Sequence, residues 1–379
     1  MVEQFFQQIF NALSLGSLYA LIAIGYTMVY GILRLINFAH GDIFMLGGYL
    51  AFYAVTLFFM PWWVGFIVAL GLTGIMGIGL ERAAYRPLRN SPRISIMISA
   101  IGASFLLQSL ATVIFGGRLK VPPTPEIFKK IVRIGSAVSD ETAALASEAA
   151  MRASTLADEA VVIASELTDE AVVIASELTD EAAVLAAKLA DEAATLAAKL
   201  ADEASVIASE VAQVEASFGI SVVSVSLFIP VITAILLIVL QTIVHKTKTG
   251  MAMRAVSTDL RAARLMAIDV NKIVSFTFGA GSVLAAIGGI MWTLKYPALI
   301  PTIGTMPGLK CFIAAVIGGI GNITGAVLGG ILLGFIEIMM VAAVPALTGY
   351  RDAFAFVLLI VVLLVRPSGL LGKHQIEKV

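Results

Sequence analysis

The stretch from Arg34 to Tyr49, RLINFAHGDIFMLGGY, places three side chains with functional chemistry in an otherwise apolar region: Asn37, His40 and Asp42. Ionisable groups at membrane depth are costly, and they mark a substrate path or a broken helix. The alternative is a turn in which Asn37 and Asp42 cap the following helix. Neither a proton relay nor a metal site is expected at His40, because no second ligand has a suitable spacing.

Two further polar residues lie in the apolar stretch from Ala314 to Glu337, AAVIGGIGNITGAVLGGILLGFIE. Its glycine pairs permit close helix packing or a broken helix, and packing is the ordinary role of most of them. Asn322 lies in the expected break, Gly318 to Asn322, and Glu337 is a second ionisable group inside the membrane. Asn37, His40, Asp42, Asn322 and Glu337 are therefore our candidates for a translocation pathway.

The segment from Lys246 to Ile273, KTKTGMAMRAVSTDLRAARLMAIDVNKI, is a loop of good helix formers. Ser257 is expected to cap a short helix whose apolar face carries Leu260, Ala263 and Ala267. A short amphipathic helix between two spans lies on the membrane surface or docks a soluble partner.

Apolar spans must position these residues, because the chain of 379 residues is 59% hydrophobic, only 13% charged and has a mean hydropathy of +0.97. Such a chain cannot bury its apolar surface in one soluble core. Runs of about 17 to 25 residues can cross a bilayer as helices. We expect an all-α, polytopic membrane bundle of about eight spans, at 8–33, 43–60, 62–82, 94–116, 222–244, 273–294, a glycine-broken pair within 309–344, and 351–366.

The basic residues of the short loops set the expected orientation, because such loops face the cytoplasm. One loop carries Arg82, Arg86, Arg89 and Arg93, and the loop 245–272 carries six further basic residues. Parity then places the N-terminus outside, the C-terminus in the cytoplasm and residues 117–221 outside the cytoplasmic membrane. A multi-pass protein of the bacterial inner membrane is the expected setting.

The segment 137–217 differs from the rest of the chain in charge and pattern. It holds 17 acidic and three basic residues, and five eleven-residue copies begin at Leu156, Leu167, Leu178, Leu189 and Leu200. We therefore divide the chain into a first permease part, 1–136, this coiled-coil insert, 137–217, and a second permease part, 218–379.

An eleven-residue period, about 3.67 residues per turn, keeps each position on one face of a helix. The expected coiled-coil seam consists of Leu156, Ala160, Ile163, Leu167, Ala171, Ile174, Leu178, Leu189 and Leu200. The flanks IVRIG and FGISVVSVSLF resemble two arms of a short loop with close ends, which favours a helical hairpin over one long helix. The insert either serves no specific task or binds a partner subunit, and we advance packing against a partner as the hypothesis.

Several classes of function lack the residues they need. One cysteine, Cys311, excludes an internal disulfide framework, and the three histidines have no cysteine partners at zinc-site spacing. No nucleophile and base constellation is apparent, so an enzyme is not expected, and no nucleic-acid partner is expected either. The chain also lacks a GxxxxGK[ST] phosphate loop. If ATP drives transport, the ATPase must be a separate subunit, and this chain itself needs no cofactor.

Several motifs in order make a resemblance specific: SLGSLYALIAIGYTMVYGILRLINFAHGDIFMLGGY, ERAAYRPLR, GMAMRAVSTDLRAARLMAIDVNKI, CFIAAVIGGIGNITGAVLGGILLG and VLLVRPSGLLGKHQIEKV. Together they resemble the LivH-type permease of branched-chain amino acid ABC transporters, over nearly all of the chain outside 137–217. The family has a short external loop where this chain carries its repeat.

The resemblance implies an importer with four further components: a second, LivM-like permease, two cytoplasmic ATPase subunits that bind ATP and Mg²⁺, and an external substrate-binding protein. It also implies that the region meeting an ATPase includes Arg254, Ser257, Asp259, Leu260, Arg261, Arg264 and Ile268. Related permeases handle urea and short amides, which leaves the substrate open.

Two other functions compete with an ATP-driven importer. An envelope coiled-coil scaffold needs only a membrane anchor, and eight spans with polar breaks exceed that need. An ion-coupled transporter acting alone needs acid pairs inside the membrane, whereas only Asp42 and Glu337 are available. Membrane lipid is a partner of the chain in each of these functions.

Overall fold

Long apolar helices form most of the part of the chain that the computed structural model describes, which is residues 2–33, 37–89, 91–134, 155, 199 and 220–372. Contacts divide the chain into two units. One comprises Met1–Gln4 and Lys130–Val222, and the other comprises Phe5–Lys129 and Val223–Val379. The second unit contains every candidate pathway residue and the candidate coupling region.

The helices in chain order are α1 (Val2–Leu33), α2 (His40–Thr56), α3 (Trp62–Leu80), the π-helix η1 (Glu81–Tyr85), α4 (Arg93–Phe115), α5 (Glu126–Lys129), α8 (Ser224–Lys246), α9 (Lys248–Thr258), α10 (Leu260–Leu265), α11 (Val270–Lys295), α12 (Thr305–Gly318), α13 (Ile323–Ala343), the 3₁₀ helix η2 (Pro345–Tyr350) and α14 (Arg351–Val365). The expectation of a polytopic, helical membrane protein is confirmed.

Seven of the helical segments in the described part of the chain are long and apolar enough to cross a membrane. They are Phe5–Leu33, Trp62–Tyr85, Ile94–Phe115, Ser224–Lys246, Val270–Lys295, Ile323–Ala343 and Pro345–Val365. The expected span 43–60 differs, because α2 begins at His40 and has only 17 residues. At 1.5 Å per residue α2 is about 25 Å long, shorter than a hydrocarbon core of about 30 Å.

The expected broken pair is present, since α12 ends at Gly318 and α13 begins at Ile323. Gly319 and Gly321 have φ angles of +107° and +89°, a backbone conformation that glycine adopts without a Cβ penalty. The C-terminal segment covers this break: Leu370 N–H donates to Ile317 O at 2.8 Å, and Leu371 N–H donates to Gly318 O at 3.0 Å. Carbonyls that α12 leaves free at its end are thus satisfied.

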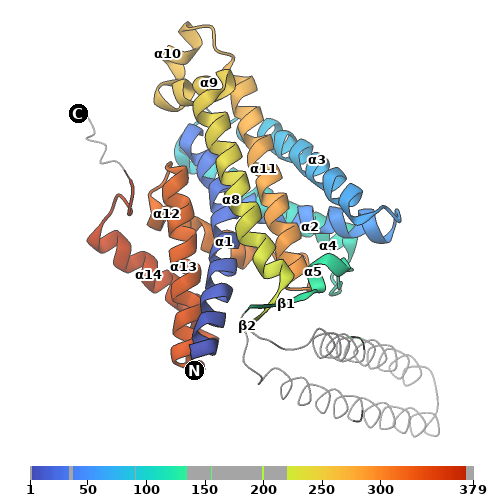
Figure 1. The fold of residues 1–379 in the computed structure, drawn as a ribbon. Helices are drawn as coiled ribbons and strands as arrows, with labels where there is room; N and C mark the ends of the chain where they lie inside the picture. Colours follow the sequence, from blue (N-terminus) through green and yellow to red (C-terminus); the bar gives the residue numbers. More distant parts are fainter. Residues whose placement is uncertain are drawn as a thin grey trace, which may run out of the picture. The chain divides into compact units, whose positions relative to one another are not determined.

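The helices α1, α2 and α11 form the interior of the larger unit, and most of their side chains are buried. In Figure 1, α1 runs between α8 and α13. Hydrogen bonds agree with that view, because Thr233 Oγ1 of α8 donates to Ser17 O of α1, and Tyr19 of α1 donates to Glu337 of α13. The polar stretch at the start of α2 therefore lies in the interior.

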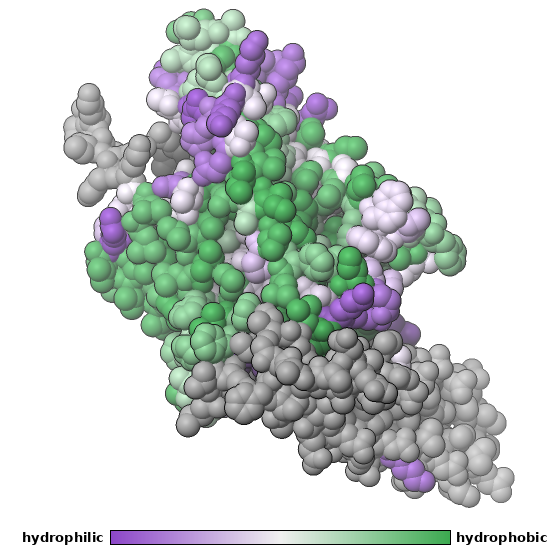
Figure 2. Space-filling model, in the orientation of Figure 1, coloured by the Kyte–Doolittle hydropathy of each residue, from purple (hydrophilic) through white to green (hydrophobic). Residues whose placement is uncertain are grey.

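The helices α4, α8 and α14 are mostly exposed although their exposed side chains are apolar. Figure 2 shows the resulting apolar surface over the spans, with hydrophilic residues gathered over α9 and α10. An exposed apolar surface of this extent needs lipid or another membrane protein as its neighbour.

The smaller unit contains a two-stranded sheet formed by β1 (Ile131–Ile134) and β2 (Ile220–Val223). Paired strands lie about 4.8 Å apart, so the two flanks of the insert are close together, as their sequences predict. The coiled-coil seam, the hairpin and the domain bounds at 137 and 217 lie outside the described residues.

Candidate functional site

The polar stretch before α2 is buried and bonded to neighbouring helices. Tyr85 Oη donates to Asn37 Oδ1 at 2.6 Å, and His40 Nε2 lies 3.2 Å from Ile22 O of α1. The N-cap of α2 is Ala39, which makes no side-chain cap. The alternative in which Asn37 and Asp42 cap this helix is therefore wrong, because Asn37 is instead engaged by Tyr85. Asn37 and His40 hold the start of α2 against α1 and η1.

Asp42 has a different environment from its two neighbours in the motif. Gln108 Nε2 of α4 donates to its Oδ1 at 2.9 Å. Its Oδ2 is buried and has no hydrogen-bond partner among the described residues. A cavity of about 200 Å³ adjoins this carboxylate. The cavity is lined by Tyr26, Phe38, Gly41, Asp42, Ile101, Ser104, Phe105, Gln108, Gly304, Thr305, Gly308, Leu309 and Phe312.

Two helix N-termini meet at this cavity, those of α2 and α12. A Cβ on Gly41 would lie 2.4 Å from Gly304 O, so the two backbones touch where only glycine fits. Neither start is capped by a side chain, since the N-caps are Ala39 and Gly304. Helix N-termini carry partial positive charge. The cavity therefore combines a carboxylate, the positive ends of two helix dipoles and apolar walls.

Glu337, the second acidic candidate, lies in a balanced ion cluster formed by α12, α13 and the start of α14. Lys310 Nζ is 2.6 Å from Glu337 Oε1 and 2.6 Å from Asp352 Oδ1, and Arg351 also pairs with Glu337. Tyr19 Oη donates to Glu337 Oε2 at 2.9 Å. The charges of the two acids and the two bases in this cluster sum to zero. Its contacts join α1 to α12, α13 and α14.

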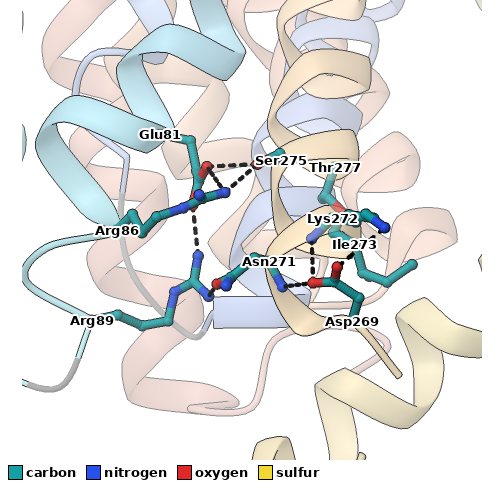
Figure 3. A network of polar contacts seen from close by, with 9 residues as sticks. All are labelled: Glu81, Arg86, Arg89, Asp269, Asn271, Lys272, Ile273, Ser275 and Thr277. Carbon is teal, nitrogen blue, oxygen red and sulfur yellow. Dashed lines mark hydrogen bonds and ion pairs between the residues drawn. The ribbon is translucent and has the colours of Figure 1, made fainter. Parts of the chain in front are cut away.

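A third buried carboxylate, Glu81, was not predicted from the sequence, in which its loop stands out only for its arginines. Figure 3 shows Arg86, Arg89 and Ser275 converging on it. Arg89 Nη2 lies 2.6 Å from Glu81 Oε1, and Ser275 Oγ donates to Oε2 at 2.7 Å. Arg89 Nη1 also donates to Asn271 Oδ1 at 2.9 Å. The sequence signal for this ion cluster was the spacing of a glutamate and two arginines, five and eight residues apart.

The candidate coupling region forms α9 and α10, with one correction to its expected cap. Asp259 Oδ1 accepts from Arg261 N and Ala262 N, at 2.7 and 3.1 Å, whereas Ser257 lies in the last turn of α9. Because α9 continues through Thr258, the helix break falls two residues later than the sequence predicts. These backbone N–H groups, that of Ala262 first, lower the pKa of Asp259 below its usual value.

The apolar face of α10 also differs from the expected one. Ala263 is buried and Leu260 half-buried, as expected, but Ala267 is exposed with a φ of +59° because the helix ends at Leu265. The apolar side chains that face outward are Leu265 and Met266, at 87% and 77% exposed. Of the remaining candidates, Arg261 and Arg264 are exposed and Ile268 is half-buried.

A second cavity, of about 880 Å³, joins the coupling region to the break between α12 and α13. Its lining includes Arg254, Ser257, Asn322 and the C-terminal Leu371. Arg254 donates to Val244 O, and Asn322 caps α13 by accepting from Gly325 N while its Nδ2 donates to Leu371 O. Asn322 therefore lies with the coupling region and the C-terminal segment, apart from both Asp42 and Glu337.

The arginine loop that follows η1 and the basic segment 245–272 lie at one end of the larger unit. The contact of Arg89 with Asn271 brings the arginine loop beside the start of α11, and the second cavity brings α9 beside the C-terminal segment. Figure 1 shows α9 and α10 together at this end.

Apolar spans around a mainly apolar cavity that holds a buried carboxylate, with a hydrophilic helical surface at one end, are the features of a polytopic transport protein of the membrane. The model of the family "branched-chain amino acid transport system / permease component" matches residues 8–363. The chain belongs to this family, and it is a transport subunit rather than an enzyme.

Its relatives are permease proteins. It is 33% identical to the high-affinity branched-chain amino acid transport system permease protein LivH of Salmonella typhimurium, over 99% of this chain and 98% of the relative. It is 32% identical to the corresponding protein BraD of Pseudomonas aeruginosa, over 100% and 99%. The ribose import permease protein RbsC of Escherichia coli is 32% identical over 24% of this chain. No solved structure matches.

Proposed function

We propose that this chain is a permease subunit of an ATP-driven importer for branched-chain or related hydrophobic amino acids. The observation that carries the proposal is the end-to-end similarity to LivH and BraD, permease proteins of branched-chain amino acid transport systems. The mainly apolar cavity beside Asp42 supports a substrate of this kind. Permeases for urea and short amides are the second candidate, because the same cavity has polar groups that an amide could use.

The partners of the importer are a second permease, two ATPases and an external binding protein. The exposed apolar faces of α4 and α14 offer surface to a second permease, and α10 offers Leu265 and Met266 to an ATPase. The end with the two basic loops faces the cytoplasm, in keeping with the positive-inside rule. The protein then spans the bacterial inner membrane, with 117–221 outside and the C-terminus inside.

Deleting the gene for this chain is expected to abolish high-affinity uptake of labelled leucine, isoleucine and valine by the host cells, because the permease provides the only path through the importer. Expression of the tagged chain should restore uptake and co-purify a second permease and ATPase subunits. Restored uptake of urea without leucine would favour the second candidate. Purification of the chain without any ATPase would contradict the proposal.

The double change Leu265→Asp and Met266→Asp is expected to weaken binding of the ATPase by at least about tenfold. Apolar anchors dominate such interfaces, and two new carboxylates would have to be desolvated on binding. The measurement is the amount of ATPase retained on the purified permease. Leu119→Asp is the matched control, since Leu119 is also exposed (58%) but lies in the loop after α4. Equal loss in both variants would contradict a docking role for α10.

A further inference from the structure

Three carboxylates are buried in the described part of the chain: Asp42, Glu81 and Glu337. Glu81 pairs with two arginines, and Glu337 pairs with Lys310 and Arg351. Asp42 forms no ion pair among the described residues, and one of its oxygens has no hydrogen-bond partner there. An unpaired buried carboxylate is strongly unfavourable. The one buried acid without a cation from the chain is also the one that borders the cavity.

The cavity is large enough for a small organic molecule. Its volume of about 200 Å³ exceeds that of an apolar cavity of about 150 Å³ that binds benzene. Most of its wall consists of aromatic and aliphatic side chains, among them Tyr26, Phe105 and Phe312. Besides the Tyr26 hydroxyl, the polar side chains of the lining are those of Asp42, Ser104, Gln108 and Thr305, the last at the start of α12. Such a wall suits a ligand with one apolar part and one charged part.

The N-terminus of α12 supplies the complementary charge. Gly304 and Thr305 line the cavity at the start of this 14-residue helix, whose N-cap has no side-chain bond. The partial positive charge there favours a carboxylate. Asp42, in the first turn of α2, supplies a negative charge beside it. A cation and an anion on one small ligand are the features of an amino-acid zwitterion.

We propose that this cavity binds the transported amino acid inside the permease, with Asp42 accepting hydrogen bonds from its α-ammonium group. The carboxylate lies at the start of α12, and the aliphatic side chain lies against the aromatic wall. The inference rests on the proposed function and adds to it that the permease itself selects a zwitterion with an apolar side chain. Selection is thus not confined to the external binding protein.

The test is uptake of labelled leucine by cells whose only copy of the chain carries Asp42→Asn. This change keeps an oxygen for Gln108 and removes the charge. Uptake at saturating leucine is expected to fall at least tenfold, while the purified complex keeps its ATPase subunits and its ATPase activity stimulated by loaded binding protein. Glu126→Gln is the control, because Glu126 is an exposed carboxylate (71%) at the start of α5, outside the cavity lining. Cells with this variant should take up leucine normally.

A second measurement uses the chain with Asp42 intact. Ser104→Cys, in a Cys311→Ala background, places a thiol in the cavity wall, and its rate of modification by a cationic methanethiosulfonate is followed in the purified complex. Leucine with binding protein and ATP is expected to slow the modification severalfold. Leu106→Cys, two residues along the same helix and outside the cavity lining, should react at a rate that leucine does not change.

The two readouts separate the outcomes. Uptake by Asp42→Asn within twofold of the unaltered chain, or no protection of Ser104→Cys by leucine, overturns the inference and leaves the proposed function in place. If Asp42→Asn loses its ATPase subunits as well as uptake, Asp42 is needed for folding and the labelling result decides. Failure of the unaltered chain to support leucine uptake overturns the proposed function and the inference with it.

Discussion

Glu337→Gln is expected to destabilise the purified chain by about 3–5 kcal/mol, because the change leaves buried cations without their shared anion. Lys310 is only 7% exposed and pairs with both Glu337 and Asp352. The unaltered cluster holds two acids and two bases, so its net charge is zero. Loss of Glu337 leaves an excess positive charge among packed helices. The measurement is the midpoint of thermal unfolding in detergent.

If charge balance stabilises the cluster, it also predicts the outcome of a double-mutant cycle. Lys310→Met alone should destabilise the chain by a similar amount, because it leaves an excess negative charge. Combining it with Glu337→Gln leaves Arg351 with Asp352 and restores neutrality, so the double variant should be no less stable than either single one. Asp352→Asn is the control with a smaller effect, since Asp352 is 51% exposed. Additive losses in the double variant would contradict a charge-balanced cluster.

This cluster shows how far the sequence could predict the site. Glu337 stands out as an acid within an apolar run, which is a local property of the sequence. Its partners on α12 and α14 are 27 and 14 residues distant along the chain, and no periodicity links them to it. Only the folded arrangement of α12, α13 and α14 reveals that Glu337 is neutralised by the chain itself, whereas Asp42 is not.

The elements were predicted better than the contacts between them, for a physical reason. A helix that crosses a bilayer needs about 20 consecutive apolar residues, so the local composition is enough to predict it. The glycines around Asn322 likewise predicted the break between α12 and α13. The short α2 was extended too far because Leu57, Phe58 and Phe59 continue the apolar run beyond the helix, and all three are exposed.

The cap of α10 was misplaced because Ser257 and Asp259 are both good N-cap residues two positions apart. Composition alone does not decide between them. The backbone does, because α9 continues through Thr258 and Asp259 is the first residue with an extended conformation, at φ −151° and ψ 115°. The outward position of Leu265 and Met266 was not predicted for a similar reason: the helix ends at Leu265, and the spacing of Leu260, Ala263 and Ala267 does not show that end.

Glu81→Gln is the second change with a large expected effect, again about 3–5 kcal/mol, because Glu81 is fully buried and Arg89 is only 8% exposed. The cluster in Figure 3 joins η1 to the first turns of α11 through Ser275 and through the contact of Arg89 with Asn271. Burial lowers the pKa of Arg89, and the Glu81 carboxylate opposes that effect. The guanidinium therefore loses its main compensating charge in this variant.

The expected result is local as well as global. Amide hydrogen exchange should become faster in η1 and in the first turns of α11, because the contacts that hold them together are the ones removed. Arg82→Gln is the matched control, since Arg82 is an exposed residue of the same π-helix outside the cluster and should leave exchange unchanged. Because α11 directly follows α10, opening at this point should also loosen the surface proposed to meet the ATPase. Unchanged exchange in Glu81→Gln would show that packing alone holds η1 against α11.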